Sequence, residues 1–244
     1  IGAQELEARL QATAAGKYKL LYIAPERLNS FRFLNLLKNI EIEMIAVDEG
    51  HCVSQWGHDF RPSYLNISQV VENLDSRPIL TAFTATATPE VKNDISIQLK
   101  MEEPKIYSSG FDRPNLSFKL RKGIDKDQFL KDYLKVNSEQ PGIIYAATRK
   151  EVNRVYELLS DLEYEVGRYH AGLSEKQRTA AQEDFIYDQI KIVVATNAFG
   201  MGIDKSNVRF VIHYNMPKNM ESYYQEAGRA GRDGEAADCI LLYS

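Results

Sequence analysis

The sequence predicts an α/β protein with parallel sheets, and three observations support this prediction. Short β-rich apolar runs recur along the chain, and segments with a helical spacing of apolar residues separate them. The composition is 44% hydrophobic and 26% charged, which is typical of a globular protein with a packed core. At roughly 150 residues per domain, the length of 244 residues fits either two compact lobes or one large domain.

Six apolar runs are predicted to form strands, at residues 19–23, 44–47, 79–83, 142–145, 192–195 and 209–213. A helix is predicted after the fourth run, because apolar residues recur there at spacings of three and four: Val152, Val155, Leu159 and Leu162. Thr148 and Glu151 have the spacing of a capping box at the start of this helix. Ser174 and Gln177 repeat that spacing before the next helix.

The chain is predicted to divide near Asp112. Serine, glycine and proline interrupt the pattern of strands and helices between residues 107 and 118, as in a segment that joins two lobes. We therefore expect a first lobe over residues 1–111 and a second over residues 112–244. The first lobe holds three of the predicted strands, fewer than a doubly wound sheet usually has, so we expect it to be N-terminally incomplete.

Charge and composition exclude several classes of protein. The 30 Lys and Arg residues against 34 Asp and Glu give a net charge of −4, so any nucleic acid must meet a local basic patch. No apolar run approaches the roughly 18 residues of a membrane span, and we expect an intracellular protein. Cys52 and Cys239 lie far apart without a Cys-x-x-Cys motif, so neither a disulfide framework nor a zinc site is expected.

Asp48 and Glu49 follow the predicted strand at residues 44–47 directly. Open α/β sheets bind ligands at the carboxyl ends of their strands, and an acidic pair there suits the chemistry of nucleotide hydrolysis. One carboxylate can hold Mg²⁺, and its neighbour can polarise the attacking water. The alternative is a helix cap or a solvated turn, and the four residues from Asp48 to His51 do not decide between the two.

Residues 52–64 contain the single tryptophan of the chain, Trp56, among His58, Phe60 and Arg61. Rings and a guanidinium group in one glycine-containing loop suit stacking on bases and contact with phosphate. The alternative is an aromatic cluster packed beneath a loop. Further along, residues 84–88 place threonines after another predicted strand, where they can bind a partner by hydrogen bonds or simply cap the helix that begins at Pro89.

Two segments of the second half carry glycines beside charged residues. Residues 195–206 match neither a P-loop, since Asp204 and Phe199 stand where glycines are required, nor a dinucleotide fingerprint, so we expect a flexible, partner-facing loop. Near the C-terminus, Gln225, Arg229 and Arg232 would share one face of a helix. Gly228 and Gly231 inside such a helix indicate close approach to something flat or charged, and a solvated arginine face is the alternative.

Taken together, these segments resemble superfamily 2 helicases, and specifically the RecQ family of DNA helicases. The Asp48–His51 segment is similar to motif II, although the family usually has Ala at position 50, and the aromatic-rich loop at 54–64 is distinctive of RecQ proteins. The remaining resemblances are residues 84–88 to motif III, 142–148 to motif IV, 193–205 to motif V and 223–234 to motif VI.

The resemblance implies two RecA-like lobes with ATP in the cleft between them and single-stranded or partially duplex DNA across both. It implies 3′ to 5′ translocation, in replication, recombination or repair. Asp48 would bind Mg²⁺, Glu49 would activate water, and His51 would couple the nucleotide site to the aromatic-rich loop. Contact with DNA, or coupling to it, would come from Trp56, His58, Phe60, Arg61 and Thr196. The nucleotide would be bound by Gln225, Arg229 and Arg232, with Arg232 as the arginine finger.

Two elements of the family are missing from these 244 residues, namely a glutamine motif that reads adenine and a P-loop with its lysine. We therefore expect the chain to be the middle of a RecQ helicase and to be inactive as an ATPase by itself. Two alternatives stay open: an RNA helicase of the DExH group, and a non-catalytic fragment that binds or anneals DNA.

Overall fold

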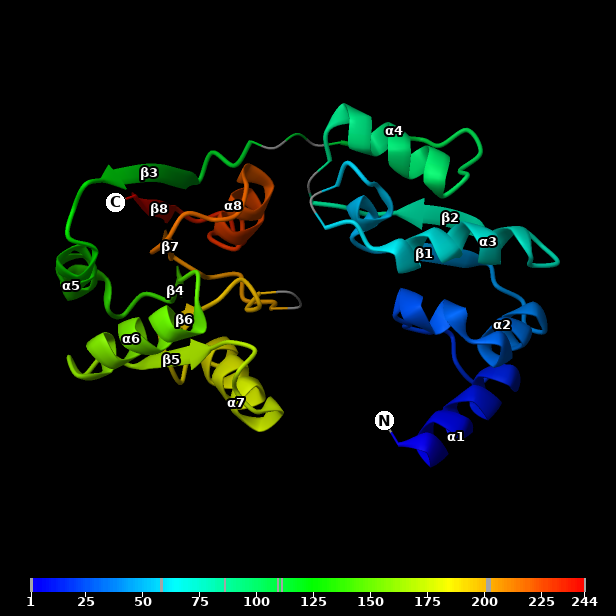
Figure 1. Ribbon diagram of the computed structural model, residues 1–244, viewed down its shortest axis with the longest axis horizontal. Coiled ribbons are helices and arrows are strands. Elements are labelled where there is room, and N and C mark those ends of the chain that lie inside the picture. The colour runs from blue at the N-terminus through cyan, green and yellow to red at the C-terminus, as the bar shows by residue number, and fades with distance from the viewer. Residues whose placement is uncertain are drawn as a thin grey trace. The chain divides into compact units, whose positions relative to one another are not determined.

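A computed structural model describes residues 2–57, 59–85, 87–108, 110, 112–200 and 203–243. The chain forms two compact units, residues 1–108 and 109–244 (Figure 1). Each unit has its own sheet and its own core. No helix in the described part of the chain is long and apolar enough to cross a membrane.

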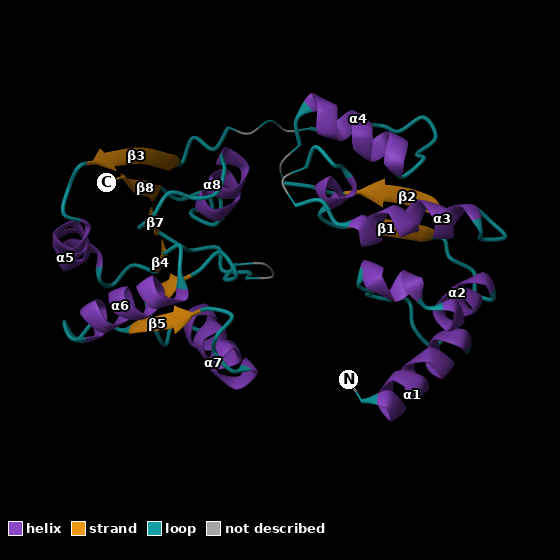
Figure 2. Ribbon diagram, in the orientation of Figure 1, coloured by secondary structure: helices purple, strands orange, loops and turns teal. Residues whose placement is uncertain are grey.

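The first unit contains a small parallel sheet with helices packed against it (Figure 2). Its strands, β1 (Met44–Val47) and β2 (Ile79–Ala82), pair in parallel with Val47 opposite Ala82. Its α-helices are α1 (Ala3–Ala14), α2 (Phe31–Lys38), α3 (Asn66–Glu72) and α4 (Pro89–Gln98). Short 3₁₀ helices span Pro25–Asn29, Gly50–Val53 and Pro62–Leu65.

The predicted strand at residues 19–23 is wrong. These residues form an irregular segment, with Leu20 72% and Tyr22 91% exposed. An apolar run becomes a strand only where a neighbouring strand accepts and donates its backbone hydrogen bonds, and in the described residues β1 and β2 pair only with each other. For the same reason β1 is only partly covered: Met44, at its start, is 55% exposed, whereas Val47, at its end, is buried.

The second unit contains a six-stranded, wholly parallel sheet with strand order β3-β8-β7-β4-β6-β5. The strands are β3 (Leu116–Lys122), β4 (Gly142–Tyr145), β5 (Val166–Tyr169), β6 (Ile192–Ala195), β7 (Phe210–His213) and β8 (Ala237–Tyr243). The helices are α5 (Lys126–Asn137), α6 (Arg149–Ser160), α7 (Glu175–Ile186) and α8 (Met220–Ala227). The prediction of an α/β protein with parallel sheets is therefore confirmed.

In the larger sheet the three fully buried strands were predictable, whereas the two edge strands and the interior strand β8 were not. The strands β4, β6 and β7 are buried along their whole length, which is why they consist of continuous apolar residues. By contrast, β3 lies at one edge of the sheet and carries an exposed arginine and an exposed lysine. At the other edge, β5 includes a glycine and an arginine. These two strands and β8 were missed, and β3 begins inside the segment expected to be irregular.

Helices cover both faces of the larger sheet. Leu130 and Leu134 of α5 share one core cluster with Val155 of α6, whereas Phe185 of α7 and Ala227 of α8 belong to the cluster on the other face. Of the two predicted capping boxes, that of Ser174 and Gln177 is complete. At α6, Thr148 Oγ1 accepts a hydrogen bond from the Glu151 amide at 3.1 Å, which is the N-cap half of the box. Leu162 lies beyond the end of α6 and is 44% exposed.

Candidate functional site

Asp48 and Glu49 form a tight turn at the carboxyl end of β1. The Oδ1 atom of Asp48 accepts a hydrogen bond from the Glu49 amide at 2.8 Å, and Glu49 has a left-handed backbone, with φ of 49°. The amide of Gly50 donates to the Phe83 carbonyl oxygen at 2.7 Å, which ties the turn to the end of β2. Asp48 is exposed and Glu49 half-buried, so the acidic turn presents a carboxylate to solvent at the edge where α/β sheets bind ligands.

His51 connects this acidic turn with the end of β2. Its ring is 3% exposed, and Nδ1 lies 3.0 Å from Oγ1 of Thr84 and 3.3 Å from Oε2 of Glu49. Its Nε2 lies 3.7 Å from the sulfur of Cys52. Because the buried imidazole of His51 contacts both Glu49 and Thr84, it fixes the spacing between the acidic turn and the residues after β2.

Backbone contacts join the acidic turn to the aromatic-rich loop. A Cβ built on Gly57 would overlap the carbonyl oxygen of His51, so only glycine allows the loop this close. Ser54 is fully buried, and its hydroxyl donates to Oδ2 of Asp94 in α4 at 2.5 Å and accepts from the Trp56 amide at 3.1 Å. The loop is thus anchored to both the acidic turn and α4.

The aromatic-rich loop has both exposed and packed rings, and Tyr64, 9% exposed, lies in the core of the first unit. Trp56 is 79% exposed, which excludes the alternative that this ring belongs to a small core beneath the loop. Phe60 is half-buried, and the exposed Arg61 pairs with Asp59 at 2.7 Å. His58 lies outside the described residues. A surface ion pair of this kind contributes under about 1 kcal/mol to stability, so another anion can replace Asp59 as the partner of Arg61 at little cost.

The threonines after β2 divide between two roles. Thr84 contacts His51, as described above, and Thr88 caps α4 by accepting a hydrogen bond from the Val91 amide at 3.3 Å. Thr86 lies outside the described residues. The capping alternative therefore holds for Thr88, whereas Thr84 binds His51 of the same unit, and a hydrogen bond from this segment to a partner stays a prediction.

The second unit gathers two arginines on a turn that follows α8. The prediction that Gln225, Arg229 and Arg232 share one helix face is wrong, because α8 ends at Ala227 and Gly228 is its C-cap. Only Gln225 lies in the helix. We call residues 228–234 the arginine turn. It continues with short-range hydrogen bonds, such as that from the Ala230 amide to the Ala227 carbonyl oxygen at 3.0 Å.

Both arginines bind carbonyl oxygens of the segment that follows β6. Arg229 Nη1 donates to Gly200, and Arg232 Nη1 donates to Ile203 at 3.2 Å. Burial, followed by the charge of Arg229, lowers the pKa of Arg232, although its side chain stays largely exposed. Two guanidinium groups side by side form a local concentration of positive charge in a chain whose net charge is negative.

The glycines of the arginine turn approach groups within the same unit. Gly231 has a φ of 55°, and a Cβ there would lie 2.5 Å from Nδ2 of Asn115. A Cβ on Gly228 would lie 2.9 Å from the Tyr224 carbonyl oxygen. The expected close approach is therefore to neighbouring polar groups of this unit, and it does not require a ligand.

The segment after β6 packs against its own unit, contrary to the expectation of a flexible, partner-facing loop. Phe199 is fully buried, and Lys205, 5% exposed, pairs with Asp188 at 2.9 Å. Thr196 is half-buried, and its amide donates to the Tyr169 carbonyl oxygen at 3.1 Å. Met201 and Gly202 of this segment lie outside the described residues.

A buried pair beneath the arginine turn escaped the sequence analysis. His213, at the end of β7, is 1% exposed, and Glu226, in α8, is 8% exposed. The Nε2 atom of His213 lies 2.8 Å from Oε2 of Glu226. The ring of Tyr145 stacks on His213 at 5.4 Å between centroids, and its hydroxyl donates to the Phe199 carbonyl oxygen at 2.9 Å. Burial raises the pKa of this tyrosine. No local pattern in the sequence marks this pair, because 13 positions separate His213 from Glu226.

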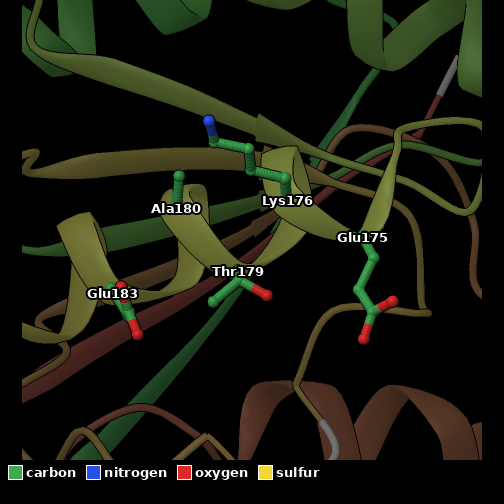
Figure 3. A pocket seen from close by; sticks show the side chains of 5 residues that line it. All are labelled: Glu175, Lys176, Thr179, Ala180 and Glu183. Atoms are coloured by element: carbon green, nitrogen blue, oxygen red, sulfur yellow. The ribbon is translucent and has the colours of Figure 1, made fainter.

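A surface pocket on α7 contains none of these residues. Its lining residues, shown in Figure 3, are Glu175, Lys176, Thr179, Ala180 and Glu183. They come from one polar helix, so the pocket has no link to the acidic turn or the arginine turn. Within the described residues there is also no group of three or more His, Cys, Asp or Glu side chains placed to hold a metal ion.

Comparison with known protein families identifies helicase domains in both units. Residues 1–94 match the DEAD/DEAH box helicase family, and residues 125–234 match the helicase conserved C-terminal domain. Among solved structures, Saccharomyces cerevisiae Dbp5 bound to RNA and ADP BeF3 is similar with a TM-score of 0.68 and 23% identity, over 88% of this chain and 56% of that one. The structure of the Mycobacterium smegmatis helicase Lhr bound to ssDNA and AMP-PNP is similar with a TM-score of 0.68 and 21% identity, over 90% of this chain and 31% of that one. These likenesses confirm two RecA-like lobes.

Curated relatives share far more sequence with the chain. It is 53% identical to the ATP-dependent DNA helicase RecQ of Bacillus subtilis over 241 residues, which is 99% of this chain. The identity is 41% to RecQ of Pasteurella multocida over 98% of the chain, and 43% to the RecQ-like DNA helicase BLM of Xenopus laevis over 93%. The chain spans only 41%, 37% and 17% of these three relatives, in the same order.

Proposed function

Because the chain belongs to the RecQ family of DNA helicases, we propose that it is the motor segment of an ATP-dependent DNA helicase that moves 3′ to 5′. We call the proposed full-length protein the parent helicase. Its substrates are single-stranded and partially duplex DNA, and its site of action is intracellular. The observation that supports this most directly is that His51 contacts both Glu49 of the acidic turn and Gly57 of the aromatic-rich loop.

In this proposal, residues of both units act on ATP. Asp48 holds Mg²⁺, which when bound neutralises charge on the phosphates. An exposed carboxylate suits that role, because Mg²⁺ usually takes one or two protein carboxylates and completes its shell with phosphate and water. Glu49 orients and polarises the attacking water. Gln225 and Arg229 bind the nucleotide, and Arg232 acts as the arginine finger.

The link between DNA and hydrolysis runs through His51 in this proposal. DNA contacts Trp56, His58, Phe60 and Arg61 of the aromatic-rich loop, and Thr196 in the second unit. The buried His51 contacts Glu49 and Thr84, and its backbone packs against Gly57. A shift of the loop backbone at Gly57 would therefore move His51 and, through it, the Glu49 carboxylate that activates water. Stacking on bases is tolerant of sequence, which suits a motor that must pass over any DNA.

The decisive experiment is a comparison of Glu49→Gln with Glu43→Gln in the parent helicase. Glu43 is an exposed acid just before β1 and serves as the matched control. We expect Glu49→Gln to bind ATP with unchanged affinity and to lose DNA-stimulated hydrolysis, and Glu43→Gln to keep both. Equal hydrolysis by the two variants would refute the assignment of Glu49.

Two other functions predict different measurements. An RNA helicase of the DExH group would show stronger stimulation of its ATPase by RNA than by single-stranded DNA of the same length. A non-catalytic fragment would anneal complementary strands without ATP, and the 244-residue chain can be tested for this directly.

A further inference from the structure

The residues at the start of the second unit bind the arginine turn. Nη2 of Arg113 donates hydrogen bonds to the carbonyl oxygens of Ala230 at 3.0 Å and Gly231 at 2.8 Å. Its Nη1 lies 3.5 Å from the Gly228 carbonyl oxygen. One guanidinium group therefore contacts three carbonyl groups of the arginine turn, which begins where α8 ends.

Asn115 completes this contact from two residues further along. Its Nδ2 donates to the carbonyl oxygens of Gly231 and Glu235, each at 2.8 Å, and its own carbonyl oxygen accepts from the Ala237 amide at 3.0 Å. The close packing explains why position 231 holds glycine, since a Cβ would collide with the Asn115 amide. We call Arg113 and Asn115 together the turn clamp.

Electrostatics favour arginine in this position. The C-terminal end of a helix carries the negative end of its dipole, and a cation there is stabilising. Arginine stays charged at any ordinary pH and presents several N–H groups in one plane, so it can satisfy neighbouring carbonyl groups together. Lysine would keep the charge but could not hold the same set of acceptors.

We propose that Arg113 is a positioning residue for the two arginines of the turn. It fixes the backbone from which Arg229 and Arg232 reach the carbonyl groups of Gly200 and Ile203. It also follows closely the point at residues 108 and 109 where the chain passes from one unit to the other. The turn that carries the arginines is thereby fastened to the beginning of the second unit. The expected effect on hydrolysis rests on the proposed function, but the clamp itself does not.

Hydrogen exchange on the 244-residue chain tests the clamp without ATP. In Arg113→Lys and Arg113→Ala, we expect amides of residues 228–235 to exchange at least about ten-fold faster, with β4 and β6 unchanged, because local opening is independent of the core strands. Arg121→Ala is the control, since Arg121 is an exposed arginine of β3 with the same charge. Unchanged protection of residues 228–235 in Arg113→Lys would overturn the proposal. If Arg113→Ala unfolds the unit, the exchange rates of residues 228–235 in Arg113→Lys alone decide the test.

Kinetics of the parent helicase test the positioning role. For Arg113→Lys we expect kcat to fall by about 10²-fold, the effect typical of misplaced catalytic groups, while the nucleotide Kd and the melting temperature change little. A purely structural residue would instead lower the melting temperature and leave the kcat of the folded protein intact. An inactive wild type would refute the proposed function, whereas an active wild type matched by Arg113→Lys in kcat would refute the positioning role alone.

Discussion

Gly200 lies directly against the guanidinium group of Arg229, which donates a hydrogen bond to its carbonyl oxygen. A Cβ at position 200 would overlap Cζ and Nε of that arginine, and the φ of Gly200 is 132°. The Nε atom of Arg229 is buried, with no hydrogen-bond partner in the described part of the chain. The position of this arginine therefore depends on the absence of a side chain at residue 200.

We predict that Gly200→Ala lowers the free energy of unfolding for two reasons. A strained backbone alone costs about 1–3 kcal/mol, and the methyl group adds to this cost because it displaces Arg229. Gly234→Ala is the matched control: its φ of 87° is also one that alanine rarely adopts, but no atom of the described residues lies within 4 Å of the added Cβ. Urea unfolding of both variants measures the difference. Equal destabilisation would mean that the contact with Arg229 is without consequence.

The 244-residue chain should hydrolyse essentially no ATP by itself. Phosphoryl transfer depends mainly on positioning and charge neutralisation, and no P-loop sequence is present to cradle the phosphates. The measurement is phosphate release by the purified chain with Mg²⁺ and single-stranded DNA. Turnover of about 1 per second or faster would contradict this prediction.

Trp56→Ala in the parent helicase should reduce DNA-stimulated ATPase more than basal ATPase. The ring is 79% exposed, so its removal leaves the core intact, and loss of one stacking contact weakens DNA binding by no more than about 1–3 kcal/mol. Phe31→Ala is the control, because Phe31 is 78% exposed in the same unit and lies outside the aromatic-rich loop. Parallel loss of both rates would instead indicate a structural role for Trp56.

Arg232→Ala in the parent helicase should lower kcat by about 10³-fold or more with little change in nucleotide Kd, since an arginine finger acts on the charge of the transition state. Arg232→Lys should restore little of the lost kcat, because lysine lacks the planar guanidinium group with its paired N–H donors. Single-turnover hydrolysis at saturating ATP and DNA gives the rates. If either variant keeps more than about a tenth of the rate, a loss under roughly 1.4 kcal/mol, Arg229 becomes the better candidate.

Both cysteines should resist thiol reagents until the protein unfolds. Burial raises the pKa of Cys52 to about 11 and that of Cys239 to about 12, from an ordinary value of 9.0. The folded state therefore holds thiol protons that the unfolded state releases, and the stability from this source is present below pH 9 and declines as pH rises through about 11. Labelling with a thiol reagent at pH 8, with and without urea, tests this. Rapid labelling of the native chain would contradict it.

The sequence by itself determined the class of fold, the family and the residues on which the proposed site depends. Continuous apolar runs predicted β4, β6 and β7 because strands buried on both faces must be apolar throughout. The capping residues Thr148 and Ser174 were predictable because a cap depends on residues only three positions apart. Such signals are local, so no knowledge of the tertiary structure is needed to read them.

Only the tertiary structure decided how the candidate residues are held. The irregular segment at residues 19–23, the edge strand β3 and the end of α8 at Ala227 depend on which strands and loops lie beside them. The contact of His51 with Thr84 and that of Arg113 with the arginine turn join residues 33 and up to 118 positions apart. A hydrogen bond between distant residues leaves no periodic trace in the sequence, because its geometry is set by the packing of the whole unit.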